Sequence, residues 1–135
     1  MQIRRIKESD YDTLVQWWKD WGWTPPSKDF LPEGGTGGYI VLVDDKPVCA
    51  AFMYITNSAV CWLDWVISDK NFREKEKRKE ALYHLLRVME QIADSLDHVK
   101  YIYALIKNNS LIEKYKELGF TQADSYNTEM IKKIK

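Results

Sequence analysis

Apolar and polar residues follow two different rhythms along this chain of 135 residues. Short runs rich in β-branched and aromatic residues predict strands, over residues 2–7, 39–43, 48–56, 59–68 and 99–106. Apolar residues at steps of three and four predict helices, which follow Ser9, cover residues 81–96 and follow Ser110. The pattern therefore predicts a protein in which strands and helices are mixed.

Capping residues mark the ends of two of these helices. Ser9 and Ser110 are each followed three residues later by an acidic residue, which is the capping-box pattern of a helix start. Gly22 and Gly119 predict the ends of the same two helices, because glycine readily adopts the left-handed conformation there. Phe120 begins a last sheet segment in this interpretation, and Met130–Ile134 is its final strand.

The order of the predicted elements indicates the fold class. Turns at residues 44–46 and 57–58 join three strands into an antiparallel meander. A strand–helix–strand unit follows, and its two strands are expected to be parallel. We therefore predict a mixed α/β sheet with helices on both faces, in a single domain over residues 1–135.

The direction of Asp64 depends on the second turn of the meander. With two turn residues, Asp64 shares a sheet face with Cys49, Ala51 and Met53. A bulge in either strand would reverse this parity, so the direction stays open.

Four tryptophans crowd between residues 17 and 23, just before an irregular segment rich in proline and glycine. Neighbouring helical positions diverge by about 100°, so one helix face cannot bury all four. In one interpretation Trp18 and Trp21 belong to the core. In the other, Trp17, Trp23 or Phe30 forms the wall of a ligand site, a homodimer contact or a protein-partner surface.

Composition narrows the classes of function. Twenty basic and twenty acidic residues cancel, which argues against a bulk electrostatic grip on nucleic acid or on an anionic membrane. Cys49 and Cys61 both fall in predicted strands, as buried free thiols would. No apolar run reaches membrane-spanning length, and His84 and His98 lack ligand-like partners. We expect a cytoplasmic protein that binds no metal.

A candidate anion site follows the central strand. A strand that leads into a helix N-terminus presents free N–H groups and the positive end of the helix dipole. Four cations lie in the polar stretch between them, namely Arg73, Lys75, Lys77 and Arg78. The alternative is a solvated turn, in which Glu74, Glu76 and Glu80 offset this charge.

The C-terminal part resembles a known family. Residues 108–120 read NNSLIEKYKELGF, which resembles the pattern of Asn, three spacers and a helix ending Tyr-x-x-x-Gly-Phe in the GNAT superfamily of acyl-CoA-dependent N-acyltransferases. The order of elements resembles that family over essentially the whole chain. The sequence is also similar to small GNAT-like proteins of tailed phages, which share the Trp-Trp and Pro-Pro segment.

This resemblance implies acetyl-CoA as a co-substrate and direct transfer of its acetyl group to an amine. It implies that Asn108 contacts the pantetheine arm and that Tyr115 is the general acid. It also implies that the N–H of Val66 or Ile67 polarises the thioester carbonyl, and that the backbone as far as Ser68 binds the cofactor with the four cations. Asp64 is the candidate base, because it is the only acid inside the central strand.

Each of these residues also has an ordinary structural interpretation. Tyr115 has the spacing of a core aromatic residue, and Asn108 is typical of a turn at a strand end. Asp64 could instead accept a hydrogen bond from a neighbouring tryptophan.

The central loop departs from the family pattern. Glu76 and Arg78 stand where the family has two small residues, which let the backbone approach a pyrophosphate. A carboxylate about 5 Å from one phosphate charge costs roughly 3 kcal/mol at an effective dielectric constant near 20. Two hypotheses therefore remain: a small N-acetyltransferase, or a catalytically inactive GNAT-fold phage protein that acts as a binding or virion-associated module. The second would act in the host cytoplasm or in the virion.

Overall fold

The computed structural model describes residues 1–126 and 128–135 of the chain. Its internal contacts divide the chain into two compact units, Met1–Leu105 and Ile106–Lys135. Each unit is described by itself below.

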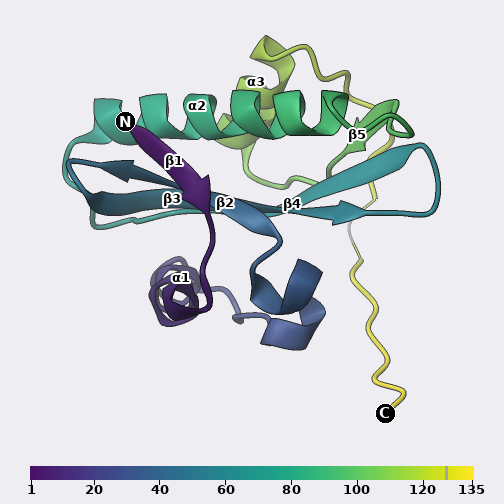
Figure 1. The fold of residues 1–135 in the computed structure, drawn as a ribbon, viewed down its shortest axis with the longest axis horizontal. Helices are drawn as coiled ribbons and strands as arrows, with labels where there is room; N and C mark the ends of the chain where they lie inside the picture. Colours follow the sequence, from purple (N-terminus) through teal and green to yellow (C-terminus); the bar gives the residue numbers. More distant parts are fainter. Residues whose placement is uncertain (127) are drawn as a thin grey trace. The chain divides into compact units, whose positions relative to one another are not determined.

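The first unit is built on a sheet whose strands lie side by side in chain order (Figure 1). These strands are β1 (Gln2–Arg5), β2 (Gly38–Val43), β3 (Lys46–Ile55), β4 (Val60–Ser68) and β5 (Tyr101–Tyr103). The pairs from β1 to β4 are antiparallel, whereas β5 is parallel to β4. The predicted meander and the predicted parallel unit are both confirmed.

Helices cover both faces of this sheet (Figure 1). Helix α1 (Tyr11–Asp20) lies on one face, together with 3₁₀ turns at Lys28–Phe30 and Pro32–Gly35. Helix α2 (Lys75–Asp94) lies on the other face and buries the apolar residues predicted for it, including Ala81, Leu85 and Met89. The mixed α/β fold class is confirmed. Helix α2 begins earlier than its apolar pattern suggests, so half of the predicted charged turn is helical.

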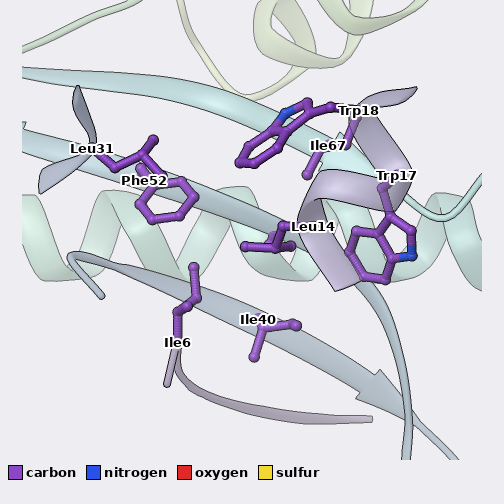
Figure 2. Close-up of a cluster of buried hydrophobic side chains, with 9 residues drawn as sticks. Ile6, Leu14, Trp17, Trp18, Leu31, Ile40, Phe52 and Ile67 are labelled. Carbon is purple, nitrogen blue, oxygen red and sulfur yellow. The ribbon is translucent and has the colours of Figure 1, made fainter. Parts of the chain in front are cut away.

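The core between α1 and the sheet corrects the prediction for the tryptophans (Figure 2). Trp17 and Trp18 are both buried, with 4% and 0% of their surface exposed, whereas Trp21 and Trp23 are exposed. The prediction of Trp18 and Trp21 as the core pair was therefore wrong for Trp21. Both rings belong to one buried cluster with Leu31 and with residues of β2, β3 and β4, so two adjacent positions of the helix are covered.

The two ends of α1 differ in how well they were predicted. Ser9 does not cap the helix. Asp10 precedes the first residue of α1, but its side chain does not bond the first turn of the helix. Its carboxylate accepts the Lys7 N–H at 2.7 Å and hydrogen bonds from both Nη atoms of Arg4 at 2.8 and 3.0 Å. At the other end, Gly22 has φ +80° and its N–H donates to Lys19 O, so the predicted C-terminal glycine is confirmed.

The second unit contains α3 (Asn109–Glu117). Its cap is Asn108, whose side-chain oxygen accepts the Leu111 N–H at 3.0 Å, so the predicted cap at Ser110 was wrong. Gly119 ends the helix with φ +94°, as predicted.

The predicted last sheet segment is not formed. Residues 121–126 and 128–135 have no helix or strand. The side chains of Met130, Ile131 and Ile134 are exposed, so no burial of apolar surface stabilises a strand there.

Candidate active site

A bulge interrupts the central strand β4 next to Val66 and Ile67, the residues whose N–H groups the family resemblance assigns to the thioester carbonyl. Asp64 pairs with Phe52 and Ile67 pairs with Ala50, so Trp65 and Val66 together face the single residue Ala51. Trp65 has φ +55°, a conformation that is unusual for a bulky residue. Such a kink changes the direction in which the following backbone N–H groups point.

The turn between β3 and β4 reverses the parity expected from a two-residue turn. The pairs from Ile55 and Cys61 to Phe52 and Asp64 are regular, so the shift arises in the turn, and the bulge lies beyond Asp64. Strands β3 and β4 are joined by residues 56–59 and not by residues 57–58 alone. Because Asp64 pairs with Phe52, it shares a face with Phe52 and not with Cys49, Ala51 and Met53. Asp64 therefore lies on the face that α1 covers.

Asp64 has a structural bond at the bulge. Its Oδ1 accepts the backbone N–H of Trp65 at 2.7 Å. The donor is the backbone amide of a neighbouring tryptophan, so this bond agrees with the structural interpretation of Asp64. The bond compensates the amide of a residue whose backbone conformation takes it out of the regular ladder.

Side chains on the α1 face hold Trp65 in place. Its indole Nε1 donates to the hydroxyl of Tyr54 at 2.8 Å, and that hydroxyl donates to Phe30 O at 2.8 Å. The ring of Trp65 also meets Trp18 and Phe30 edge to face, with centroid distances of 5.9 and 6.0 Å. The irregular segment before β2 is thus bonded to the bulge, a link that no local sequence pattern indicates.

Strand β4 extends well past its parallel neighbour. The ladder between β4 and β5 ends at the pair Trp62 and Tyr103, whereas β4 continues to Ser68. Within the first unit, the bulge therefore lies on a part of β4 that β5 does not pair with.

A short loop, residues 69–74, connects β4 to the N-terminus of α2. The first helical hydrogen bond runs from Arg78 N to Glu74 O at 3.0 Å, and no side chain caps the start of the helix. The N–H groups of the three preceding helical residues accordingly have no partner within the helix. The helix dipole favours an anion at this end.

The four predicted cations differ in what they contact. Arg73 and Lys75 are exposed. Lys77 forms an ion pair with Glu74 at 2.9 Å, and the pKa of Lys77 is raised mainly by this hydrogen bond. Arg78 is partly buried, and its Nη1 donates to the carbonyls of Asp69 and Lys70 at 3.2 and 3.1 Å. Two of the four are therefore engaged within the protein.

The C-terminus of α1 holds the other side of this loop. The indole Nε1 of Trp21 donates to Ser68 O at 2.8 Å, and Lys70 Nζ lies 5.2 Å from the centre of the Trp21 ring. Asn71 Nδ2 donates to Asp20 Oδ2 at 3.3 Å. Sequence reasoning missed this role of Trp21, because the partners are separated by about fifty residues.

The remaining candidates fall into two groups. Of the aromatic wall candidates, Trp23 and Phe30 are 48% and 47% exposed, but Trp17 is buried and leaves little surface for a ligand. Of the backbone candidates, Val66 is half-buried, whereas Ile67 and Ser68 are buried at the end of β4.

Tyr115 and Asn108 belong to the second unit, where both have structural contacts. The rings of Tyr115 and Phe120 have centroids 4.7 Å apart, and Phe120 N donates to Tyr115 O at 3.0 Å. This bond, together with Gly119 N to Lys116 O, makes a Schellman motif. The motif accounts for the Tyr-x-x-x-Gly-Phe pattern within the unit.

The two cysteines are free thiols, and both are buried, as predicted. Burial raises the pKa of each thiol, which makes either a poor nucleophile. In the described part of the chain, no group of three or more His, Cys, Asp or Glu residues gathers as a metal site. No helix among those residues is long and apolar enough to span a membrane.

No family model and no curated protein matches this sequence. Solved structures do match it. The ribosomal-protein-S18-alanine N-acetyltransferase of Escherichia coli has a TM-score of 0.67 and 18% identity, over 91% of this chain and 79% of that one. The aminoglycoside acetyltransferase meta-AAC0020, from an uncultured soil metagenomic sample and in complex with sisomicin, has a TM-score of 0.66 and 12% identity, over 99% and 96%.

A third match carries a cofactor. The N-acetylglutamate synthase of Neisseria gonorrhoeae, complexed with coenzyme A and N-acetyl-glutamate, has a TM-score of 0.65 and 16% identity, over 91% of this chain and 28% of that one. At such identities the similarity concerns the fold. Together with the bulged central strand, its open edge and the helix that follows, it shows that the chain has the fold of the GNAT acetyltransferases.

Proposed function

We propose that this protein is an N-acetyltransferase that binds acetyl-CoA beside β4 and transfers the acetyl group to an amine. The observation that carries the proposal is the course of β4. This strand bulges at Trp65, runs past the end of β5 and leads into a helix whose first N–H groups are uncapped. The N–H groups that would bind the thioester carbonyl then lie on β4, and those that would bind the phosphates follow at the start of α2.

The reaction requires few protein groups. The amine nitrogen attacks the thioester carbonyl carbon, a C–N bond forms and the C–S bond breaks. The amine loses one proton, and the departing CoA thiolate gains one. The N–H of Val66 or Ile67 would polarise the carbonyl, because the bulge turns this part of the backbone out of the regular ladder.

Two side chains are proposed for the proton transfers. Asp64 would accept the proton of the amine directly or through water. Its bond to Trp65 N uses one carboxylate oxygen, and a carboxylate can accept several hydrogen bonds. Tyr115 would protonate the thiolate, since a phenol carries its proton at neutral pH.

The phosphates of CoA would bind at the start of α2. The uncapped N–H groups there and the exposed side chains of Arg73 and Lys75 supply the charge. The pantetheine arm would pass Asn108, in keeping with the family pattern. The coenzyme A in the matched synthase supports this choice of cofactor.

The acceptor is proposed only as a class. One matched enzyme is named for an alanine of a ribosomal protein and another for aminoglycosides, so amines of very different size fit this fold. In the present chain, the exposed rings of Trp23 and Phe30 are the candidates for the acceptor wall.

One observation favours the second candidate function, a catalytically inactive module of phage origin that binds a protein partner. Lys77, Arg78 and Asn108 are each engaged in an ion pair, loop bonds or a helix cap. A protein that keeps this fold without binding CoA would be free to use these side chains in internal contacts.

Calorimetric titration with acetyl-CoA, and separately with free CoA, distinguishes the two functions. Micromolar binding is expected for the transferase, followed by release of free thiol when an active amine is supplied. An absence of binding at millimolar ligand would contradict the transferase proposal and favour the binding module.

A further inference from the structure

Arg78 lies where the family pattern has a small residue, and its side chain folds back over the start of α2. Its backbone N–H makes the first hydrogen bond of the helix, to Glu74 O. Its Nη1 donates to Asp69 O and Lys70 O, the first two carbonyls of the loop. Within the described residues its guanidinium bonds these two carbonyls and forms no ion pair with a carboxylate.

These two bonds matter because of the charge on a carbonyl oxygen. A carbonyl that turns towards an anion repels it, whereas a backbone N–H attracts it. The loop contains both kinds of group within a few residues of the uncapped helix end. A guanidinium that binds two adjacent carbonyls fixes their direction and offsets their partial negative charge.

The loop is also held from the opposite side. Trp21 donates to Ser68 O, and Asp20 accepts from Asn71. Inside the loop, Asp69 accepts the N–H groups of Asn71 and Phe72 at 2.9 and 3.2 Å. Arg78 therefore completes a set of bonds that orders residues 68–72 without any ligand.

We propose that Arg78 is a positioning residue, which holds the loop in the shape that leaves the N–H groups of α2 open to the phosphates of CoA. The inference rests on the proposed function. It replaces the expectation that Arg78 grips phosphate directly, and it leaves that direct role to Arg73 and Lys75. In the family pattern a small residue lets the backbone approach the phosphates, whereas here the hydrogen bonds of the Arg78 side chain would keep the N–H groups of α2 accessible.

The first test needs no ligand. Amide hydrogen exchange is measured on Arg78→Ala, on Arg78→Lys and on Lys79→Ala, a control that removes the same charge from an exposed position one residue away. We expect faster exchange at Asn71 and Phe72 in Arg78→Ala, partial recovery in Arg78→Lys and no change in Lys79→Ala. Equal exchange in all the proteins would overturn the proposal.

The second test titrates the same variants, and Arg73→Ala, with free CoA at low and high salt. A direct ion pair makes affinity salt-dependent, because salt screens exposed charges. We expect Arg78→Ala to bind about tenfold more weakly than Lys79→Ala with the same salt dependence, and Arg73→Ala to be less salt-dependent. A reduced salt dependence in Arg78→Ala beyond that of Lys79→Ala would make it a phosphate ligand and overturn the positioning role.

The two tests distinguish a failure of the positioning role from a failure of the proposed function. If the unaltered protein binds no CoA, the proposed function is contradicted, and hydrogen exchange still decides whether Arg78 orders the loop. If CoA binds and Arg78→Ala matches Lys79→Ala in affinity, the positioning role is contradicted and the proposed function stands.

Discussion

The indole N–H of Trp65, a residue of the bulge in β4, donates to the hydroxyl of Tyr54 on β3 at 2.8 Å. The same hydroxyl donates to Phe30 O, in the irregular segment before β2. Trp65 is in the left-handed region of backbone conformation, which a bulky residue occupies only when its surroundings hold it there. Tyr54 therefore links the bulge to the segment before β2 by hydrogen bonds, beside the ring contacts of Trp65 with Trp18 and Phe30.

Replacing Tyr54 with phenylalanine tests this link. Tyr54→Phe leaves the Trp65 N–H and Phe30 O without their partner, so we expect the free energy of unfolding to fall by about 1–3 kcal/mol. Urea denaturation measures it. Tyr39→Phe is the matched control, since in the described part of the chain the Tyr39 hydroxyl has no hydrogen-bond partner and its ring contacts Arg5. It should change stability by less than about 0.5 kcal/mol. Equal losses in the two variants would contradict the link.

The fold was predictable because the signals for it are local. The alternation in β2 to β4, the apolar face of α2 and the glycines at positions 22 and 119 each depend on a few adjacent residues. Caps were less predictable. Asn108 caps α3 although the nearby Ser110 fits the capping pattern, and Ser9 fits the same pattern but makes no cap bond to α1. The last strand failed because a strand needs a partner as well as apolar residues.

The candidate site was only partly predictable. Its location after the central strand follows from the order of elements, and the cations near it are visible in the sequence. The direction of Asp64 is not visible, because one extra residue in the turn before β4 reverses every side chain that follows it. The partners of Arg78 and Trp21 are also hidden, since each reaches residues that only the folded chain brings near.

The ion pair between Arg4 and Asp10 predicts a pH dependence of stability. The hydrogen bond from Arg4 is the main cause that holds the pKa of Asp10 below its usual value, against the opposing effect of burial. The unfolded chain therefore binds a proton more readily than the folded one. This contribution to stability is complete above the ordinary pKa of an aspartate and is lost as the pH falls through the lower, folded value.

Asp10→Asn should remove that contribution. We expect the variant to be about 2 kcal/mol less stable at neutral pH, because a charged bidentate pair becomes a neutral contact. Denaturation curves at several pH values should show the difference from the unaltered protein shrinking below about pH 4. A difference that stays constant with pH would mean that Asp10 acts through its shape alone.

Two glycines should respond very differently to alanine. A Cβ at Gly119 meets nothing within 4 Å, so Gly119→Ala costs only the strain of its positive φ, about 1 kcal/mol. A Cβ at Gly38 would lie 2.1 Å from Ala51 O, between paired strands β2 and β3. We therefore expect Gly38→Ala to unfold the protein or to yield none that is soluble. Circular dichroism and urea denaturation measure both, and similar stabilities would contradict the predicted packing at Gly38.

Tyr115 offers a sharp test of catalysis, because phenylalanine removes the hydroxyl and keeps the ring. The contact with Phe120 uses the ring, whereas the proposed proton transfer uses the hydroxyl. Tyr115→Phe keeps the ring and its contact with Phe120, so CoA affinity should stay close to that of the unaltered protein. Turnover should fall by about a hundredfold or more if the hydroxyl protonates the leaving thiolate. Steady-state kinetics and calorimetry on the same preparation measure the two quantities, with Tyr101→Phe, an exposed tyrosine of β5, as the control. Parallel losses of turnover and CoA affinity would assign Tyr115 a structural role, and unchanged turnover would require another proton donor.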